Sequence, residues 1–240
     1  MARKHIVVLT GAGMSAESGI STFRDSGGLW EQYRVEDVAS IDGYVRNPEL
    51  VINFYNERRR QLLSVKPCLG HVLVAELERH FDVTVVTQNV DDLHERAGST
   101  DIIHLHGELM KATSTLSPND PSQIVTLAPQ QDIRIGDRAA DGSQLRPFIV
   151  WFGEAVPEIE RAADEVMRAD ILVVIGTSLN VYPAAGLVNF AARDCPIFLI
   201  DPKPVAWHTD HPFRHIMKGA GEGMKELTAM LTNTDTAAQG

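Results

Sequence analysis

Four short runs of β-branched and aliphatic residues recur along the chain, with helical patterns between them. The runs are continuously apolar rather than alternating, which is typical of parallel strands covered by helices on both faces. We expect strands at Ile6–Leu9, Val83–Val86, Ile171–Ile175 and Ile197–Ile200. Helices are predicted over residues 70–80, 157–168 and 183–193. This alternation predicts an α/β fold with a parallel sheet that binds ligands at the carboxyl ends of its strands.

Two stretches interrupt the alternation. Residues 31–66 contain a helical pattern where a simple crossover would reach a second strand, and residues 108–148 are polar with several Pro and Gly. We expect both stretches to form a smaller inserted module. The remaining parts then form a Rossmann-like domain of residues 1–30, 67–107 and 149–231. The polar residues 232–240 predict a disordered tail.

Composition narrows the class of protein. The chain has 240 residues, of which 44% are hydrophobic and 22% charged, enough for one large domain with a small insert. Its net charge of -10 disfavours nucleic acid and anionic membranes as partners and suits a positively charged one. Two cysteines, Cys68 and Cys195, cannot build a disulfide framework or a four-thiolate metal site. With apolar runs too short for a bilayer and no signal-peptide pattern, we expect a cytoplasmic protein.

The first strand runs into a glycine-rich turn. Gly11, Gly13 and Ala16 fit the G-x-G-x-x-[G/A] dinucleotide pattern, in which backbone amides approach a pyrophosphate at a helix N-terminus. A tight strand-to-helix turn without a ligand would explain the glycines equally well. The acid that usually follows about 20 residues later is missing, so Asp201 at the end of the last strand is the candidate for the ribose.

Other strand ends carry polar groups as well. Gln88, Asn89 and Asp91 follow the second strand, and carboxamides suit a neutral amide such as nicotinamide because they donate and accept. Capping of the next helix is the alternative explanation for these side chains. His106 ends a further expected strand and could act as a general base, although a lone strand-end histidine is usually structural. With the small donors of residues 176–178, these groups favour a nucleotide-using enzyme over a passive binding domain.

The inserted helix carries an arginine among apolar residues. Arg58 shares a face with Val51, Phe54, Tyr55 and Leu62, where a guanidinium needs an anionic partner. Tyr55 and Arg58 are three residues apart, so their side chains can converge on one carboxylate. A structural salt bridge to an internal Asp or Glu is the commoner solution, and a ligand carboxylate is the other.

Five motifs in order resemble the sirtuins, and the resemblance runs from the first strand to about Leu231. The motifs are residues 11–24, 87–91, 105–107, 150–154 and 176–178. The resemblance is closest to the bacterial and mitochondrial class that removes acidic acyl groups, which carries a carboxylate-binding tyrosine and arginine where Tyr55 and Arg58 stand. From this resemblance we expect the anion that pairs with Arg58 to be the carboxylate of the substrate. Gly43 looks like the small residue that widens the acyl pocket.

The resemblance implies an NAD-dependent protein-lysine deacylase that transfers the acyl group to ADP-ribose and releases nicotinamide. His106 is then the general base, with Asn89 beside it in the catalytic set. The residues expected to contact NAD are Gly11, Ala12, Gly13, Ala16, Thr22, Phe23, Arg24, Trp30, Gln88, Asn89, Asp91, Gly176, Thr177, Ser178, Asp201 and Ala220. Those expected to bind the acyl-lysine protein or peptide are Tyr55, Arg58, Val150, Phe152, Gly153 and Glu154. No oligomeric state is predicted.

Two departures from the family pattern change the expected cofactors. Typical sirtuins carry four zinc-binding cysteines after the catalytic histidine, the first of them where this chain has Ser114. Residues 107–150 contain neither cysteine nor histidine, so we expect no zinc and no other metal. Packing would instead hold the module through Ile124, Val125, Leu127, Ile133, Ile135 and Leu145. Asp201 replaces the usual asparagine, and its charge would repel a 2′-phosphate, which favours NAD over NADP.

Two other functions stay open at this point. Mono-ADP-ribosyl transfer to a protein shares the cleavage of NAD, but a carboxylate-binding pair at Tyr55 and Arg58 has no evident use there. An NAD-sensing module without catalysis is the other alternative. A sensor would not need the general base His106.

Overall fold

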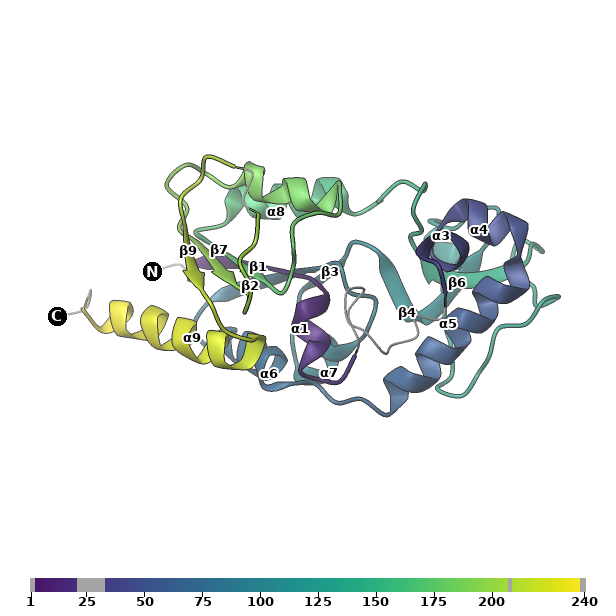
Figure 1. Ribbon diagram of the computed structural model, residues 1–240, viewed down its shortest axis with the longest axis horizontal. Helices are drawn as coiled ribbons and strands as arrows, with labels where there is room; N and C mark the ends of the chain where they lie inside the picture. Colours follow the sequence, from purple (N-terminus) through teal and green to yellow (C-terminus); the bar gives the residue numbers. More distant parts are fainter. Residues whose placement is uncertain (1–2, 21–32, 207–208, 238–240) are drawn as a thin grey trace.

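The computed structural model describes residues 3–20, 33–206 and 209–237. A parallel sheet of six strands forms its centre, in the order β3-β2-β1-β7-β8-β9 (Figure 1). The strands are β1 His5–Thr10, β2 Asp82–Thr87, β3 Ile102–His104, β7 Ile171–Ile175, β8 Ile197–Ile200 and β9 Phe213–Ile216. The predicted α/β class and the four predicted apolar strands are confirmed. Strand β9 was not predicted, because it has no continuous apolar run. It is an edge strand in which only Ile216 is buried.

Helices cover both faces of this sheet. Helix α8 Ile159–Arg168 and the 3₁₀-helix η2 Ala184–Phe190 pack on the face that includes Val7 and Leu9. Helices α6 Leu69–Leu77 and α9 Ala220–Ala237 pack on the opposite face, with Ile6 and Val8. Alternate strand residues point to opposite faces, so burial of both faces makes the strands continuously apolar.

Two of the predicted elements around the sheet differ from the structure. Residues 184–190 form a 3₁₀-helix instead of the α-helix expected over 183–193. Gly186 bonds to the carbonyl of Pro183, three residues back, and glycine and the β-branched Val188 both weaken an α-helix. The tail prediction is wrong for residues 232–237, which continue α9. Once the buried turns around Met224 and Leu227 form, each further residue adds a hydrogen bond at little cost.

The small module lies at one end of the molecule, on the right of Figure 1. Its helices are α3 Val35–Val38, α4 Ile41–Arg46 and α5 Pro48–Leu63. They share a core with an antiparallel sheet in the order β5-β4-β6, which the sequence did not predict. The strands are β4 Gly107–Ser114, β5 Val125–Thr126 and β6 Leu145–Ile149, and the short 3₁₀-helix η1 Pro121–Gln123 precedes β5. Two-residue β5 and the proline within β6 explain why no strand pattern was visible.

Only part of the apolar set expected in this module is buried. Leu127, Ile133 and Leu145 belong to its core. Val125 is 45% and Ile135 53% exposed, so the packing role expected for these two is wrong. Val125 lies on the edge strand β5, and Ile135 precedes a glycine in a turn, so neither has a second layer to pack against.

Hydrogen bonds tie the module together around Ser114, where the resemblance to the sirtuins implies a zinc-binding cysteine. Ser114 is fully buried, and its Oγ donates to the carboxylate of Asp141 and lies 2.9 Å from Ser143 Oγ. The same oxygen accepts from the amides of Leu116 at 3.0 Å and Ser117 at 2.9 Å. The bond from Ser114 lowers the pKa of Asp141. We call Ser114, Asp141 and Ser143 the Ser114 clasp, because it joins the end of β4 to the loop before β6.

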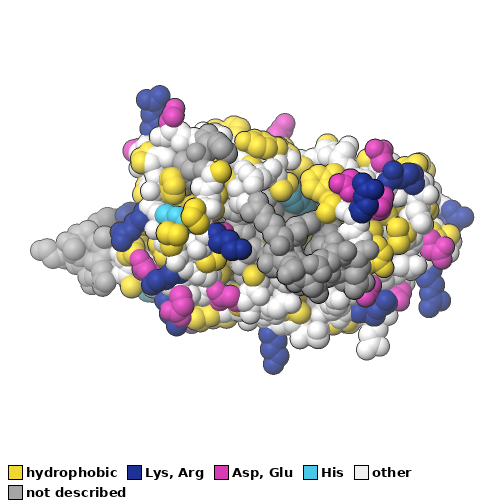
Figure 2. All heavy atoms as spheres, in the orientation of Figure 1, with side chains coloured by type: hydrophobic (Ala, Val, Ile, Leu, Met, Phe, Trp, Pro, Cys, Tyr) yellow, Lys and Arg dark blue, Asp and Glu magenta, His cyan; other side chains and the backbone are white. Residues whose placement is uncertain are grey.

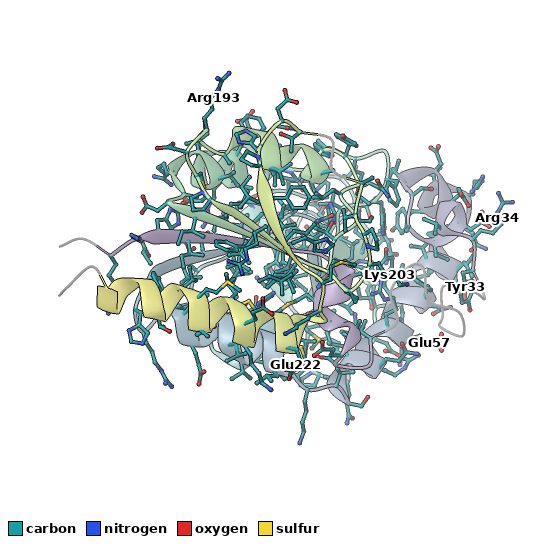
Figure 3. All side chains as sticks on the ribbon, turned by 60° about the vertical axis from the view of Figure 1, so that its left-hand side comes forward. Tyr33, Arg34, Glu57, Arg193, Lys203 and Glu222 are labelled. Carbon is teal, nitrogen blue, oxygen red and sulfur yellow. The ribbon has the colours of Figure 1, made fainter. Side chains whose placement is uncertain are left out.

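Charged side chains of both signs are interspersed on the face drawn in Figure 2. Arg193 on the sheet domain and Arg34 on the module project from the outline of the molecule (Figure 3), and Lys203 and Glu222 are exposed as well. Within residues 3–20, 33–206 and 209–237, we find no helix with the length and apolar character that a membrane span requires.

Candidate active site

The strands of the large sheet end in one layer. Thr10 of β1 is in register with Thr87 of β2 and Ile175 of β7, and Ile175 is in register with Ile200 of β8. The residues that follow these ends therefore emerge at one edge of the sheet. They include Gly11, Gln88, Gly176 and Asp201.

The glycine turn packs directly on the chain that leaves β7. The amide of Gly11 donates to Ile175 O at 3.0 Å, and that of Gly13 donates to Gly176 O at 2.8 Å. A Cβ on Gly13 would lie 2.7 Å from the Gly176 Cα. These contacts explain the glycines by close backbone packing, which leaves the predicted phosphate contact to other groups at the start of α1 Ala12–Ala16. Gly176 itself has a φ of +61°, a conformation that suits glycine.

Asn89 and Asp91 are fastened to this turn by hydrogen bonds. The Asn89 carboxamide donates to Gly11 O at 3.0 Å and to Ser15 Oγ at 3.1 Å. Ser15 donates in turn to one Asp91 oxygen at 2.9 Å, and the other accepts from the Leu93 amide at the start of α7 Leu93–Ala97. Burial raises the pKa of Asp91. Asp91 thus bonds to the first amide of the next helix, whose N-cap residue is Asp92, and it also joins the polar cluster at the sheet edge.

Two buried histidines stand behind the cluster, and sequence reasoning missed both. His71 Nε2 lies 3.5 Å from Ser15 Oγ, and His94 Nε2 lies 3.3 Å from Thr10 Oγ1. Burial lowers the pKa of His71 to about 4 and that of His94 well below its usual range. Both rings are therefore neutral at pH 7. For His94, its place three residues after the motif 87–91 was the available signal, whereas His71 lies on α6, far away in sequence.

His106 lies in the turn between β3 and β4, not in a strand as predicted. β3 ends at His104. Gly107 has a φ of +80°, and a Cβ on this residue would collide with the carbonyl oxygen of Phe148. His106 Nδ1 is 3.0 Å from Gln88 O, so Nδ1 carries the proton and Nε2 the lone pair in the neutral ring. Burial lowers the pKa of His106, which keeps the ring neutral. The side chain is thus prepared to accept a proton.

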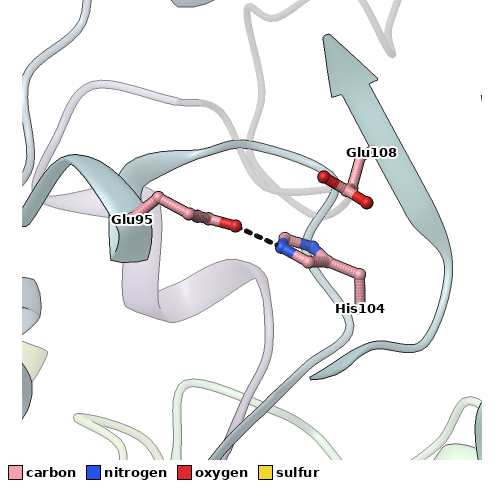
Figure 4. Close-up of side chains that lie close together, drawn as sticks. All are labelled: Glu95, His104 and Glu108. Atoms are coloured by element: carbon pink, nitrogen blue, oxygen red, sulfur yellow. Dashed lines mark hydrogen bonds and ion pairs between the residues drawn. The ribbon is translucent and has the colours of Figure 1, made fainter. Parts of the chain in front are cut away.

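A second histidine, His104, holds the same loop. Its Nδ1 lies 3.4 Å from Asn89 O and its Nε2 2.6 Å from Glu95 Oε1 (Figure 4). Although burial lowers the pKa of His104, the bond to Glu95 raises it overall. Ligand atoms of Glu95, His104 and Glu108 lie within 4.8 Å of one another, but Glu108 pairs with Lys111 at 2.8 Å. Glu95 thus bonds to His104 and Glu108 pairs with Lys111, and we interpret the group as a polar network that supports the loop.

Tyr55 and Arg58 both lie on α5 of the small module. Tyr55 is buried, and burial raises its pKa to about 12. Burial lowers the pKa of Arg58, whereas the charges of Tyr55 and Asp91 raise it. Arg58 is therefore near both Tyr55 and the sheet edge, and its guanidinium carbon lies 5.9 Å from the centre of the Phe54 ring.

The most deeply buried arginine of α5 is Arg59, not Arg58. Arg59 is 1% exposed and donates to Asn56 Oδ1 and to Gln131 O, both at 2.7 Å. The helix is buried on two sides, because the chain around Ile133 covers the face that carries Asn56 and Arg59. The buried surface of α5 is therefore wider than the single apolar stripe predicted from the sequence.

Residues 150–154 connect the two parts of the chain. The Val150 amide donates to His106 O at 3.0 Å, and the Phe152 amide donates to Ala39 O at 2.9 Å. The Phe152 ring is 51% exposed, and Gly153 has a φ of +94°. Glu154 accepts from Arg146 and from the Trp151 amide, so its carboxylate holds this segment in shape.

The other predicted site residues divide into three groups. Thr177 Oγ1 accepts from the Gln88 carboxamide at 3.1 Å, next to Ser178 at the sheet edge. Asp201 accepts from the Lys203 amide at 2.8 Å, and Ala220 is buried against Gly70, which leaves only its backbone for a ligand. Predicted residues outside the described part of the chain are Thr22, Phe23, Arg24 and Trp30.

For Gly43, predicted to widen the acyl pocket, the structure gives a different reason for the glycine. A Cβ at this position would lie 2.5 Å from Asp37 O, in the turn between α3 and α4. Packing within the module therefore explains why this residue is a glycine.

Comparisons with known proteins identify the family of the chain. A family model described as Sir2 family matches residues 11–183. A relative from Bacteroides thetaiotaomicron, named NAD-dependent protein deacylase, is 63% identical over 229 residues, which cover 95% of this chain and 98% of the relative. One from Helicobacter pylori with the same name is 50% identical over 228 residues, 95% of this chain and 97% of the relative.

Solved structures give the same result. A Sir2 homologue in complex with ADP-ribose has a TM-score of 0.85 at 38% identity and covers 98% of this chain and 94% of that one. The chain therefore belongs to the Sir2 family. Within that family it is an NAD-dependent protein deacylase, as both relatives are named.

Proposed function

We propose that the protein removes acyl groups that end in a carboxylate, such as succinyl, from protein lysines, as well as acetyl groups. The observation that carries this proposal is the pair of Tyr55 and Arg58 on α5, with Arg58 near the Asp91 end of the sheet site. A guanidinium and a phenol three residues apart on a helix can bind one carboxylate together. The net charge of -10 also suits basic, lysine-bearing substrates.

His106 is the general base in this proposal. NAD, when bound, supplies the ribose hydroxyl that accepts the acyl group and the nicotinamide that leaves. The neutral His106 ring would take a proton from that hydroxyl at Nε2, since Nδ1 is held by Gln88 O. Asn89 and Asp91, fixed by Ser15, would orient the nicotinamide half of NAD.

We also propose that the two parts of the chain have different roles. Residues 1–30, 67–107 and 149–231 would bind NAD, and the module of residues 31–66 and 108–148 would select the acyl group. Support comes from their cores: a third hydrophobic cluster, apart from the two that flank the large sheet, is built mostly from module residues, with Leu93, Ile149 and Trp151 added from the other part. NAD binding and acyl selection would meet where Arg58 lies near Asp91.

The module is proposed to function without zinc. Residues 107–150 offer no thiolate or imidazole, and the Ser114 clasp presents hydroxyl and carboxylate oxygens already bonded to one another. This donor set does not fit a tetrahedral sulfur-bound zinc ion. Metal analysis of the purified protein tests the proposal: stoichiometric zinc, or loss of activity with a chelator, would contradict it.

The choice of NAD over NADP and a cytoplasmic location complete the proposal. The Asp201 carboxylate at the end of β8 would repel a 2′-phosphate. The free thiols of Cys68 and Cys195 suit a reducing compartment.

The test measures kcat/KM for acetyl- and succinyl-lysine forms of one peptide with NAD, with products identified by mass spectrometry. Arg58→Met should lower desuccinylation at least about 10-fold and deacetylation much less, because a charge-assisted hydrogen bond is removed. Arg60→Met is the matched control, since Arg60 lies on the same helix and pairs with Asp132 at 2.6 Å. Equal changes for both peptides would refute the acyl selectivity, and ADP-ribosylated protein without free lysine would indicate a transferase instead.

A further inference from the structure

Arg146 is a buried guanidinium in the small module that none of the proposed roles uses. It lies on β6, is 2% exposed, and donates to the two oxygens of Glu154 at 2.7 and 2.9 Å. It also donates to Ile149 O at 2.7 Å. A buried guanidinium requires such a partner, and a bidentate pair fixes both side chains in one geometry. Since Glu154 also accepts from the Trp151 amide at 2.9 Å, Arg146 holds the backbone turn of residues 151–154.

The same guanidinium stacks on aromatic rings. Its central carbon lies 3.6 Å from the centre of the Trp151 ring and 5.7 Å from that of Tyr44. Trp151 in turn stacks on Tyr44 at 4.7 Å and lies 6.2 Å from Tyr55, measured between ring centres. Arg146 thus lies over the Trp151 ring, and the Tyr55 ring lies beside Trp151 at an interplanar angle of 41°. We call Arg146, Trp151 and Tyr55 the stacked wall.

The stacked wall connects two groups of the proposed substrate site. Trp151 lies between Val150 and Phe152, in the segment expected to bind the peptide. Tyr55 is the partner of Arg58 in the proposed carboxylate pair. A shift of Trp151 would therefore move Tyr55 as well as the peptide segment. Because Glu154 neutralises Arg146 through a bidentate pair, Arg146 is suited to hold this wall rather than to bind the substrate carboxylate itself.

We infer that Arg146 is a positioning residue for acyl selectivity: by stacking on Trp151 and holding Glu154, it keeps Tyr55 where Tyr55 and Arg58 can bind one carboxylate. The inference rests on the proposed selectivity for acidic acyl groups. It depends on the planar guanidinium, since a lysine keeps the charge but can neither stack flat on Trp151 nor bind Glu154 at two points.

The experiment compares the parent with Arg146→Lys, using the acetyl and succinyl forms of one peptide. Arg146→Lys should raise KM for the succinyl peptide about 10-fold, because small misplacements of binding groups are costly, and change deacetylation by less than about 3-fold. Arg138→Lys is the matched control, because Arg138 is an exposed residue of the same module. In a Trp30→Phe and Trp207→Phe background, the near-ultraviolet circular dichroism of Trp151 should change in Arg146→Lys and not in Arg138→Lys.

Arg146→Gln is the second variant if Arg146→Lys does not fold: it also breaks the bidentate pair with Glu154, and the same selective rise in KM is expected. A folded variant with an unchanged succinyl-to-acetyl ratio overturns the inference. So does an equal loss on both peptides, since a purely structural role would produce it. Arg58→Met, measured in parallel, separates the two failures: if it lowers the ratio and Arg146→Lys does not, the proposed function stands and the inference alone falls. If Arg58→Met leaves the ratio unchanged, both fall.

Discussion

The sheet edge and the small module are each stabilised by a different kind of contact. At the sheet edge, backbone geometry dominates: strands end in register, and Gly13 packs on Gly176. In the module, side chains dominate, through the stacked wall and the Ser114 clasp. Chemistry shared by a family can thus rest on the backbone, whereas the module, which we propose selects the acyl group, rests on side chains. The following predictions test this contrast, in order of expected effect.

His106→Ala should have the largest effect, on activity alone. Loss of a general base lowers kcat by about a hundred- to ten-thousand-fold. The midpoint of thermal unfolding should change little, because the variant removes mainly one hydrogen bond, the one to Gln88 O. Steady-state kinetics with the acetyl peptide provide the measurement. Activity within about 3-fold of the parent would exclude His106 as the base.

Gly13→Ala should disturb the sheet edge most. The new Cβ would meet the Gly176 Cα at 2.7 Å, a backbone contact that cannot move away as a side chain would. Overpacking of this kind costs about 1 to 3 kcal/mol, and KM for NAD should rise with it. Urea unfolding measures the first effect. Gly186→Ala is the control, since its nearest neighbour would lie 3.9 Å away, and equal stability of the two variants would contradict backbone packing as the role of Gly13.

Ser114→Ala should weaken the module without changing NAD binding. The variant removes the acceptor of the Leu116 and Ser117 amides, and each lost hydrogen bond costs about 0.5 to 1.5 kcal/mol in the free energy of unfolding. KM for NAD should stay as in the parent, because the clasp is in the other core. Ser122→Ala, at an exposed position, is the control. An equal loss in both variants would mean that the clasp contributes little.

The pH dependence should show the smallest effect. His106 must be neutral to act as a base, and burial lowers its pKa from the ordinary 6.5. The neutral form therefore persists as the pH falls through 6.5, and kcat/KM should decline only below that value. A profile of kcat/KM against pH tests this. An acid limb with an apparent pKa at or above 6.5 would contradict burial as the dominant influence on His106.

The same contrast explains what could be predicted from the sequence. Four strands and the helices α6 and α8 could be predicted from the pattern of apolar residues along the chain. The position of the polar groups at one sheet edge could be predicted because parallel strands end at the same edge. Arg59, Arg146 and His71 could not be found in this way. Their partners lie on other elements, such as Gln131 for Arg59 and Ser15 for His71, so no local pattern marks them as buried.

Failures in the module have a similar cause. Val125 and Ile135 look like core residues by hydrophobicity alone, yet edge position and a turn leave them exposed. Gly43 looked like part of a pocket, although its neighbours are carbonyls of the α3–α4 turn. In both cases the deciding fact is which atoms surround the residue in three dimensions.

The most direct test of the central claim is a double-mutant cycle between Arg58 and the charge of the acyl group. Its four kcat/KM values combine the parent and Arg58→Met with succinyl-lysine and the uncharged amide of succinyl-lysine in one peptide. A carboxylate bound by Arg58 predicts a coupling free energy of about 1.5 to 3 kcal/mol, the range for hydrogen bonds to charged groups. A coupling near zero would contradict the claim that the module selects acyl groups through Tyr55 and Arg58.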